Sequence, residues 1–384
     1  MAVPHHRHQA SLESIFRVSS SPPLEASQRS QAHGRFQEIL NHYEGTVPPN
    51  RQYKRPTLLR LMYYYASEGK SKDNMLRAFF DAIGLSIDEN TSLNFSDKET
   101  EQRISDKLIG FADFLIDNFF LPLKASTKRT PQLSPAYLSA IERSQSGKPT
   151  FVGTSARLKS LQGDCLVRDR HRCVISRRFD IAEAAKRMRA KPSDARDDDD
   201  MPLVREFGSL EVAHILPHSL TKANANLLLD KPRAAALKIL NMFDTDVAHL
   251  IEGQEIDRPR NAMTLTLDLH LVFDDFQIFF QPIEGSLNTY RIDTFLPHAL
   301  LNNVLPVTRT LFVTDERTIE PPSPRLLAVH CAIAHILHLS AAGEYIDRIL
   351  EDAAGSVVHA DGSTALGLMV QLRLDGWWDG RVAG

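Results

Sequence analysis

A short apolar segment at 209–220, SLEVAHILPHSL, strongly limits the folds open to this chain. Its residues favour an extended strand, and a proline stands near its end. Two histidines, His214 and His218, lie on either side of that proline. Because polar side chains on an apolar strand need partners, we expect residues further along the chain to face them.

A second polar set follows at 258–280, RPRNAMTLTLDLHLVFDDFQIFF. Asn261 stands in a turn rich in Arg and Pro, just ahead of another strand-prone stretch. His270 and Asp274 are four residues apart, so on a helix they share one face, a turn from each other. The expected order is therefore strand, loop, strand and short helix.

These residue types suit hydrolysis of a phosphodiester. The imidazole of His270 and the carboxylate of Asp274 can hold one divalent cation and leave its other positions open. His214 can take a proton from water near neutral pH. An amide or a backbone carbonyl from the Asn261 turn can hold that imidazole in one orientation. The residues alone thus indicate a one-metal hydrolase.

The same segments resemble the HNH endonucleases with the ββα-metal fold, in the branch common in uncharacterised fungal proteins. The likeness spans roughly 151–293 and rests on LEVAHILP at 210–217, RNAMTL at 260–265, DLHLVFD at 268–274 and the opening segment RDRHRCVISRRFD at 168–180. The resemblance implies a metal-dependent endonuclease, a hydrolase, with His214 as general base and Asn261 as the residue that orders the loop. It also implies that His270 and Asp274 are metal ligands. Mg²⁺ is the expected ion, with Mn²⁺, Ni²⁺ and Zn²⁺ as alternatives.

Ala213 departs from the family pattern, because many HNH domains carry an Asp or His metal ligand directly before the base. Glu211 lies two residues earlier on the same strand face, and its longer side chain has a gap of about 7 Å to close. His218 is the second candidate ligand if the chain folds back after Pro217. The competing interpretations are a salt bridge for Glu211 and an exposed loop position for His218.

Cysteine use argues against disulfides and structural zinc. The chain has three cysteines, Cys165, Cys173 and Cys331, and no CxxC pair. Many HNH proteins carry CxxC and a structural zinc where this chain reads CVIS from Cys173. We therefore expect no structural zinc and a reducing compartment.

Arginines near the motif are the candidate contacts to phosphate: Arg168, Arg170, Arg172, Arg177, Arg178, Arg258 and Arg260. The net charge of −3 does not oppose this role, because a nuclease needs only a local basic surface. The chain shows no recognition-helix or aromatic-interleaved pattern. We expect it to bind nucleic acid, DNA in first place, through the phosphate backbone, and these patterns do not predict sequence-specific recognition.

The whole chain reads as α+β, with a ββα-metal HNH nuclease core between predominantly helical N- and C-terminal regions. Composition and pattern divide it into a disordered segment at 1–29, a helical region at 30–150, an HNH-like domain at 151–300 and a helical region at 301–384. In the first helical region, an apolar stripe over 104–115 predicts a helix that ends at Pro122.

No segment reads as a signal peptide or membrane span, since the most apolar run, 326–339, is too short and too rich in histidine. We expect an intracellular protein of the cytoplasm or nucleus with no membrane partner. An alternative function is a catalytically silent HNH-like module for binding or regulation. Ala213 supports this alternative, and the retention of base, asparagine and both helix ligands opposes it.

Overall fold

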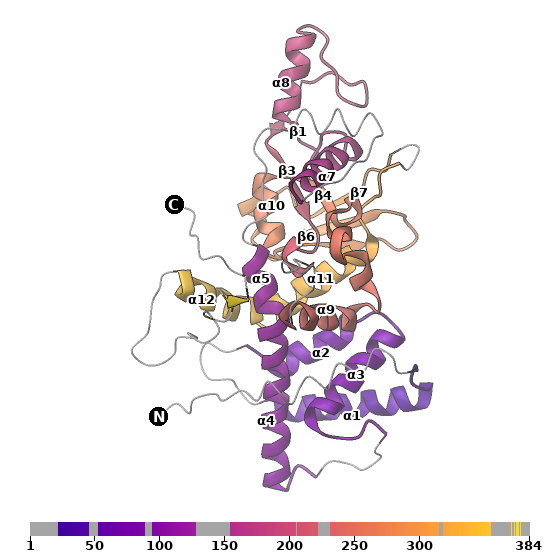
Figure 1. The fold of residues 1–384 in the computed structure, drawn as a ribbon, viewed down its shortest axis with the longest axis vertical. Helices are drawn as coiled ribbons and strands as arrows, with labels where there is room; N and C mark the ends of the chain where they lie inside the picture. Colours follow the sequence, from indigo (N-terminus) through magenta and orange to yellow (C-terminus); the bar gives the residue numbers. More distant parts are fainter. Residues whose placement is uncertain are drawn as a thin grey trace. The chain divides into compact units, whose positions relative to one another are not determined.

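The computed structural model describes residues 22–45, 53–88, 94–127, 154–204, 206–221, 231–314 and 318–354, and residues 370, 372, 374, 375 and 377. These residues combine many helices with small sheets, which confirms the α+β class (Figure 1). They fall into two compact units. The helical unit lies within Met1–Ser126, Asn224–Ala248 and His335–Gly384, and the mixed unit within Thr127–Ala223 and His249–Ala334.

The helical unit is built around an aromatic core. Its main helices are α1 (Ala26–Glu44), α2 (Arg55–Tyr65), α3 (Lys70–Ile83), α4 (Lys98–Leu115), α9 (Lys231–Phe243) and α12 (Ala342–Ala354). The ring of Phe79 on α3 meets Phe36 of α1 and Phe111 of α4 edge-on. All three rings are fully buried, so their apolar area holds the helices together.

Two helix ends differ from the sequence expectation. The helix α4 does not end at Pro122 but passes into a π-helical turn, η3 (Ile116–Phe120), and α5 (Leu121–Thr127) begins one residue before the proline. Proline is tolerated there because the N–H groups of a first helical turn have no helical partner. The helix α1 begins at Ala26, inside the predicted disordered segment, whose residues 1–21 lie outside the described part.

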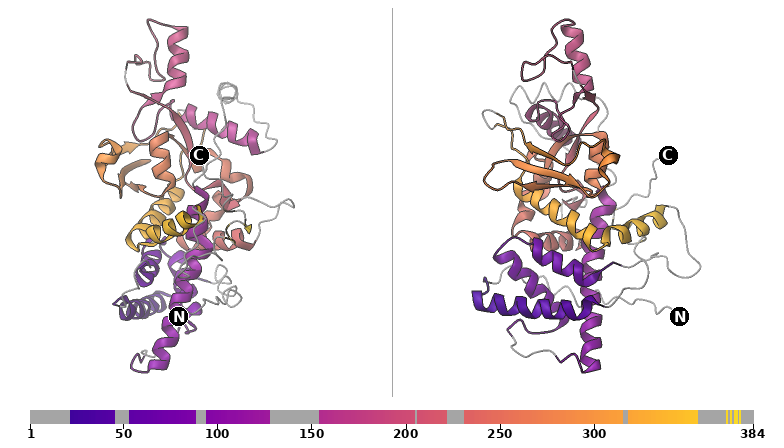
Figure 2. Two further views of the ribbon diagram at one scale, coloured as in Figure 1. Left: turned by 90° about the vertical axis from the view of Figure 1, so that its left-hand side faces the viewer. Right: turned by 180° about the vertical axis from the view of Figure 1, so that it is seen from behind.

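The mixed unit contains all the strands that the described residues form. Its elements are α7 (Thr154–Arg168), β1 (Phe179–Asp180), α8 (Ile181–Ala190), β2 (Phe207–Gly208), β3 (Leu210–His214), η4 (His218–Thr221), η6 (Gly253–Asp257), η7 (Pro259–Asn261), β4 (Ala262–Thr266), α10 (Leu267–Asp274), β5 (Ile278–Pro282), β6 (Thr289–Thr294), η8 (His298–Leu301) and β7 (Val307–Thr310). The helices η5 (Val247–Leu250) and α11 (Pro324–Leu339) cross the boundary between the units. Strands β5, β6 and β7 form an antiparallel sheet, orange in Figure 2.

The strands β3 and β4 form an antiparallel pair that places the motif residues. In its register His214 pairs with Ala262 and Glu211 with Leu265. The helix α7 covers the pair, with Leu161 and Cys165 packed against Val212 and Ala262. Strand β4 is buried along its whole length and leads directly into α10. The β3–β4 pair thus positions both the end of β3, which carries His214, and the start of α10.

Among the helices in the described part of the chain, none taken alone is long and apolar enough to cross a membrane. Only α11 and α12 together, as a bent pair, reach that length and composition.

Candidate active site

The first polar cluster joins α10 to β3. On α10, Nε2 of His270 lies 3.2 Å from Oδ2 of Asp274. On the other edge of the same ring, Nδ1 lies 2.7 Å from Oε2 of Glu211. Burial disfavours the charged imidazole, but the bonds to Asp274 and Glu211 outweigh it and raise the pKa of His270 to about 9.

The position of Glu211 follows from the pleat of β3. Residues two apart point to one face of a strand, so Glu211 shares its face with Ala213. The long side chain reaches the Nδ1 edge of His270, whereas Asp274 occupies the Nε2 edge. Glu211 therefore stands behind the ring and not beside Asp274, in the place of a carboxylate that fixes a histidine's tautomer and orientation.

The second cluster surrounds Asp257, the last residue of η6, which the motif did not single out. Nε2 of His214 lies 3.3 Å from Oδ1 of Asp257, and Nε2 of His218 lies 3.5 Å from Oδ2. Nε of Arg157, on α7, lies 3.1 Å from the same Oδ2. Burial alone would raise the pKa of Asp257, but its contacts with the two histidines hold that pKa well below its usual value.

His218 thus faces Asp257, and the carboxylate next to His270 comes from Glu211. The structure therefore separates the two candidates for the ligand position that Ala213 leaves vacant. Neither adds a donor next to His270 Nε2 and Asp274 Oδ2. In the described part of the chain, no three His, Cys, Asp or Glu side chains are arranged to hold a metal ion.

Asn261 connects the chain after β3 to the turn before β4, and it is completely buried. Its Nδ2 donates to the carbonyls of Leu216 and Ile256, each at 3.0 Å, and its Oδ1 accepts from the N–H of Leu216 at 3.0 Å. Its backbone carbonyl accepts from Ile215 at 2.7 Å. Asn261 therefore fixes the backbone that carries His214 and makes its contacts with main chain, not with the imidazole.

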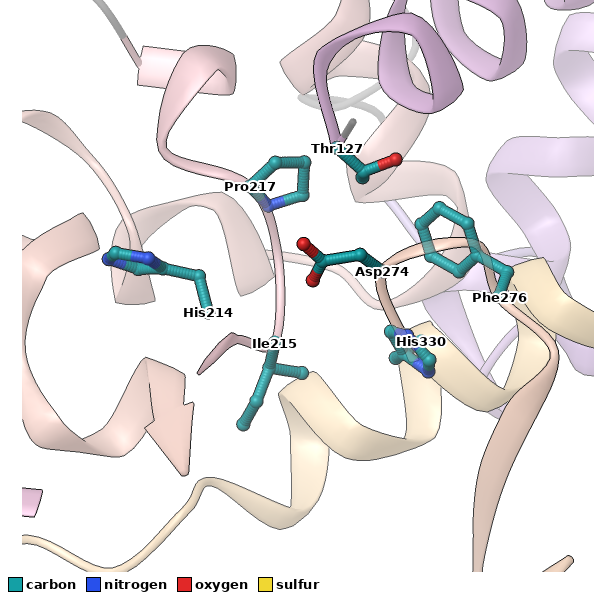
Figure 3. Close-up of a pocket in the computed structure, with 7 residues that line it drawn as sticks. All are labelled: Thr127, His214, Ile215, Pro217, Asp274, Phe276 and His330. Atoms are coloured by element: carbon teal, nitrogen blue, oxygen red, sulfur yellow. The ribbon is translucent and has the colours of Figure 1, made fainter. Parts of the chain in front are cut away.

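His214 and Asp274 line one small pocket, together with Ile215, Pro217, Phe276 and His330 (Figure 3). The carboxylate of Asp274 points toward the Ile215–Pro217 segment, whereas the imidazole of His214 points away from Asp274. Within the described residues neither ring nitrogen of His214 has a hydrogen-bond partner, although both are buried. Such buried, unsatisfied nitrogens mark a place for water or a ligand.

The residues fit an open site for one divalent cation. His270 Nε2 and Asp274 Oδ2 are a nitrogen and an oxygen donor at a spacing that lets both contact one ion. Glu211 contacts Nδ1 and so holds the ring, as carboxylates behind metal-bound histidines do. Two protein donors are enough for an ion such as Mg²⁺, which takes its remaining oxygens from water and from phosphate.

Arg168 does not reach the surface where phosphate would bind. Its guanidinium is fully buried, pairs with Asp169 and donates to the carbonyls of Pro259, Ala262 and Glu320. It holds α7 to the turn before β4. Because its side chain is buried, we no longer count Arg168 among the candidate phosphate contacts.

Acidic side chains also pair with most of the other candidate arginines. In the first stretch the pairs are Arg170–Asp199, Arg172–Asp197 and Arg178–Glu206, and around the Asn261 turn Arg258 and Arg260 share Glu255 and Glu320. Arg177 instead donates to the carbonyl of Thr310 and lies over the ring of Phe312. Phosphate would have to compete with these partners.

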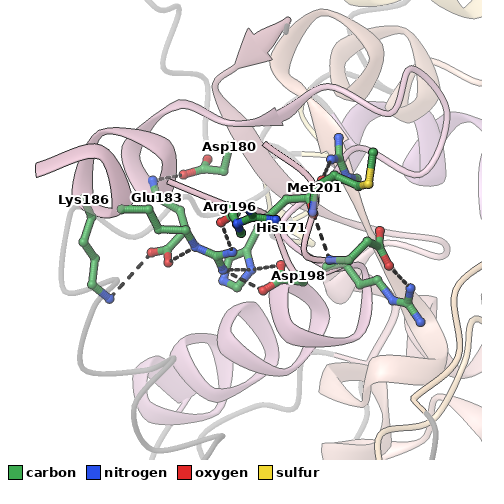
Figure 4. A network of polar contacts seen from close by, with 12 residues as sticks. His171, Asp180, Glu183, Lys186, Arg196, Asp198 and Met201 are labelled. Atoms are coloured by element: carbon green, nitrogen blue, oxygen red, sulfur yellow. Dashed lines mark hydrogen bonds and ion pairs between the residues drawn. The ribbon is translucent and has the colours of Figure 1, made fainter. Parts of the chain in front are cut away.

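Two acidic partners of the first stretch, Asp197 and Asp199, belong to the loop at 194–200 that also carries Asp198 (Figure 4). Asp198 accepts from Nδ1 of His171 at 2.8 Å and from Arg187 at 2.6 Å. Burial alone would raise the pKa of Asp198, but these bonds lower it to about 2. Most residues of the charged run at 186–200 are nevertheless exposed, and only Asp197 among them is buried.

Cys173, at the position of the usual zinc ligand, is buried and unbonded to another cysteine. Residues 173–281 match the family model described as HNH endonuclease. This range includes β3, β4 and α10, and therefore His214, Asn261, His270 and Asp274. The chain matches no curated protein and no solved structure at a significant level.

Proposed function

Since residues 173–281 make this chain a member of the HNH endonuclease family, we propose that it is a metal-dependent endonuclease that hydrolyses phosphodiester bonds in DNA. HNH endonucleases generally use a divalent metal ion, and nucleic acid is the substrate of the family. The proposal includes a ββα-metal core, for which the order β3, β4 and α10 is the support.

One observation carries the proposal: His270 and Asp274 present adjacent donors on α10, while Asp274 and His214 line the same pocket. A bound divalent cation, Mg²⁺ in first place, supplies charge neutralisation at the phosphate oxygens. Glu211 orients the His270 ring, and Asn261 fixes the backbone after β3. His214 takes a proton from the attacking water.

The arginines that remain candidates for the phosphate backbone are Arg170, Arg172, Arg177, Arg178, Arg258 and Arg260. Their side chains lie at or near the surface of the mixed unit. Each such contact exchanges an internal partner for a phosphate oxygen. Because cationic side chains displace counterions from the phosphates, we expect binding to weaken steeply as salt rises.

Plasmid nicking tests the activity. Purified protein is incubated with supercoiled DNA and Mg²⁺, Mn²⁺, Ni²⁺ or EDTA, with single-stranded DNA and RNA as further substrates. We expect metal-dependent cleavage that falls by about 10²-fold or more in His214→Ala and Asp274→Ala, the range of an acid–base or metal contribution. Asp275→Ala, which removes the neighbouring carboxylate, is the matched control and keeps its activity.

The second candidate is a catalytically silent HNH-like module, favoured by Ala213 and by the two carboxylates that pair with His270. Absence of cleavage with every metal, together with no metal binding by calorimetry, would replace the endonuclease with this module.

A further inference from the structure

Asp257 is a buried carboxylate with no place in the family motif. Its side chain is 1% exposed, and an ionised carboxylate at such depth is costly unless cations or hydrogen-bond donors surround it. Three side chains from three elements face it: His214 at the end of β3, His218 in η4 and Arg157 on α7. The protein thus maintains a buried negative charge beside the histidine that we propose as the base.

The contacts around His214 distinguish its two ring nitrogens. Nε2 faces Asp257 Oδ1 at 3.3 Å, a contact slightly outside hydrogen-bond geometry. Nδ1 has no acceptor or donor among the described residues. A neutral imidazole carries one proton, and a carboxylate next to one nitrogen favours the tautomer with the proton there.

We propose that Asp257 is the positioning residue of the reaction: it holds the proton of His214 on Nε2 and leaves Nδ1 to deprotonate the attacking water. This inference rests on the endonuclease activity proposed above. In the step, the O–H bond of water breaks and an N–H bond forms at Nδ1. The electron pair stays on the hydroxide oxygen, which attacks phosphorus. The bond from phosphorus to the leaving oxygen breaks, and that oxygen departs with the electron pair and takes a proton from water. The resulting imidazolium is paired with the carboxylate of Asp257.

Asn261 does not take this role, because its amide bonds to the main chain and not to the imidazole of His214. Its two donors and its acceptor bond to Leu216 and Ile256. Asp257 stands four residues earlier, so a single turn, η6 to η7, supplies both functions. Asn261 fixes the backbone that carries the base, and Asp257 orients the imidazole ring of that base.

The competing explanation for Asp257 is structural, since the same carboxylate binds Arg157 and thereby joins η6 to α7. Two variants separate the roles in the full chain. Asp257→Asn keeps the shape of the side chain and removes its charge. Arg157→Gln removes the link to α7 and leaves Oδ1 facing His214.

We expect Asp257→Asn to lower kcat by about 10²-fold or more, with KM changed less than about threefold, because the base loses its orientation and counter-charge. Arg157→Gln should lower the thermal midpoint by as much as Asp257→Asn while it keeps kcat within about fivefold. An Asp257→Asn enzyme with kcat within about threefold of the wild type, or an equal loss of kcat in Arg157→Gln, would overturn the proposal.

A second readout does not depend on cleavage. In full-length protein with ¹⁵N-labelled histidine, the His214 signals, assigned through His214→Gln, report which ring nitrogen carries the proton. We expect the proton on Nε2 in the wild type and a loss of this preference in Asp257→Asn. A proton on Nδ1 in the wild type would overturn the assignment. If the wild type cleaves nothing, the endonuclease proposal fails, and this measurement still decides the contact between Asp257 and His214.

Discussion

His330 lies in the interior of the mixed unit with its ring stacked on Phe273, 4.0 Å between centroids and 7° between planes. Its Nε2 lies 3.3 Å from the carbonyl of Phe273, and Phe276 covers the ring further. Complete burial lowers the pKa of His330 to about 3, and the bond to Phe273 only partly opposes this. The folded chain therefore holds His330 neutral.

This makes the stability of the protein sensitive to acid. In the unfolded chain a histidine titrates near pH 6.5, so between about pH 6.5 and 3 the unfolded state binds a proton that the folded state does not. The free energy of unfolding should fall by up to about 1.4 kcal/mol for each pH unit below 6.5. Urea unfolding of wild type and His330→Phe, between pH 7 and pH 4.5, measures this contribution.

We expect His330→Phe to be less stable at pH 7, because the Phe273 carbonyl loses its donor, but to lose less stability on acidification. His338→Phe, on the same helix but exposed, controls for removing any histidine from α11. Equal pH slopes in the wild type and His330→Phe would show that His330 does not titrate in this range.

Some contacts between single residues could be predicted from the sequence alone, and others could not. The spacing of His270 and Asp274 predicts that they share a helix face, because this depends only on helix geometry, and α10 places them 3.2 Å apart. Asp257 and the burial of Arg168 could not be predicted. Both depend on contacts between residues 40 to 150 positions apart in the chain, which no local pattern encodes.

At the scale of elements, the acidic loop at 194–200 supplies ion-pair partners to two of the arginines that we propose as phosphate contacts, Arg170 and Arg172. Arg170 lies against Asp199 and over the ring of Phe312, and its side chain is 35% exposed. A phosphate oxygen would take the place of the Asp199 carboxylate. If Arg170 contacts phosphate as proposed, we expect the loop to lower the affinity for nucleic acid.

Asp199→Asn removes the charge that Arg170 pairs with. We expect the Kd for a DNA duplex to fall by about two- to fivefold, the effect that a surface ion pair allows, with a steeper dependence on salt. Fluorescence anisotropy in EDTA, at about 50 and 200 mM salt, measures binding without cleavage. Asp200→Asn is the control: it also removes one negative charge from the loop, but Asp200 pairs with Arg196 and not with Arg170. Equal affinities for the two variants would exclude Arg170 from the binding surface.

Regular elements were easier to predict than their ends. The α+β class and the helical character of the first region followed from periodicity, which is a local property. The passage of α4 through η3 into α5 could not be predicted in this way. Proline is tolerated in the first turn of a helix, and Pro122 stands in the first turn of α5.

At the scale of the whole molecule, the two units interrupt each other along the chain. The stretch Asn224–Ala248 belongs to the helical unit, although the mixed unit contains the residues on either side of it. Its helix α9 packs on α3 and η3, where Phe243 lies 5.8 Å from Phe119 and 6.4 Å from Phe120, centroid to centroid. The domain boundaries drawn from composition, including 151–300, stay a prediction, and this connectivity provides a test of them.

A fragment of residues 127–334, which spans the mixed unit, would carry α9 without its partners. The apolar face that the full chain buries, including Ile239, Leu240 and Phe243, would then be exposed, and exposed apolar patches promote association. We expect the fragment to bind the dye ANS and to elute as oligomers in gel filtration, whereas the full chain does neither. A second fragment, with 224–248 replaced by a short Gly/Ser linker, should be monomeric and bind little dye. If the unmodified fragment is itself monomeric and does not bind ANS, α9 does not need the helical unit. Cleavage by that fragment could then be compared with cleavage by the full chain, to test whether the flanking helices restrain the nuclease.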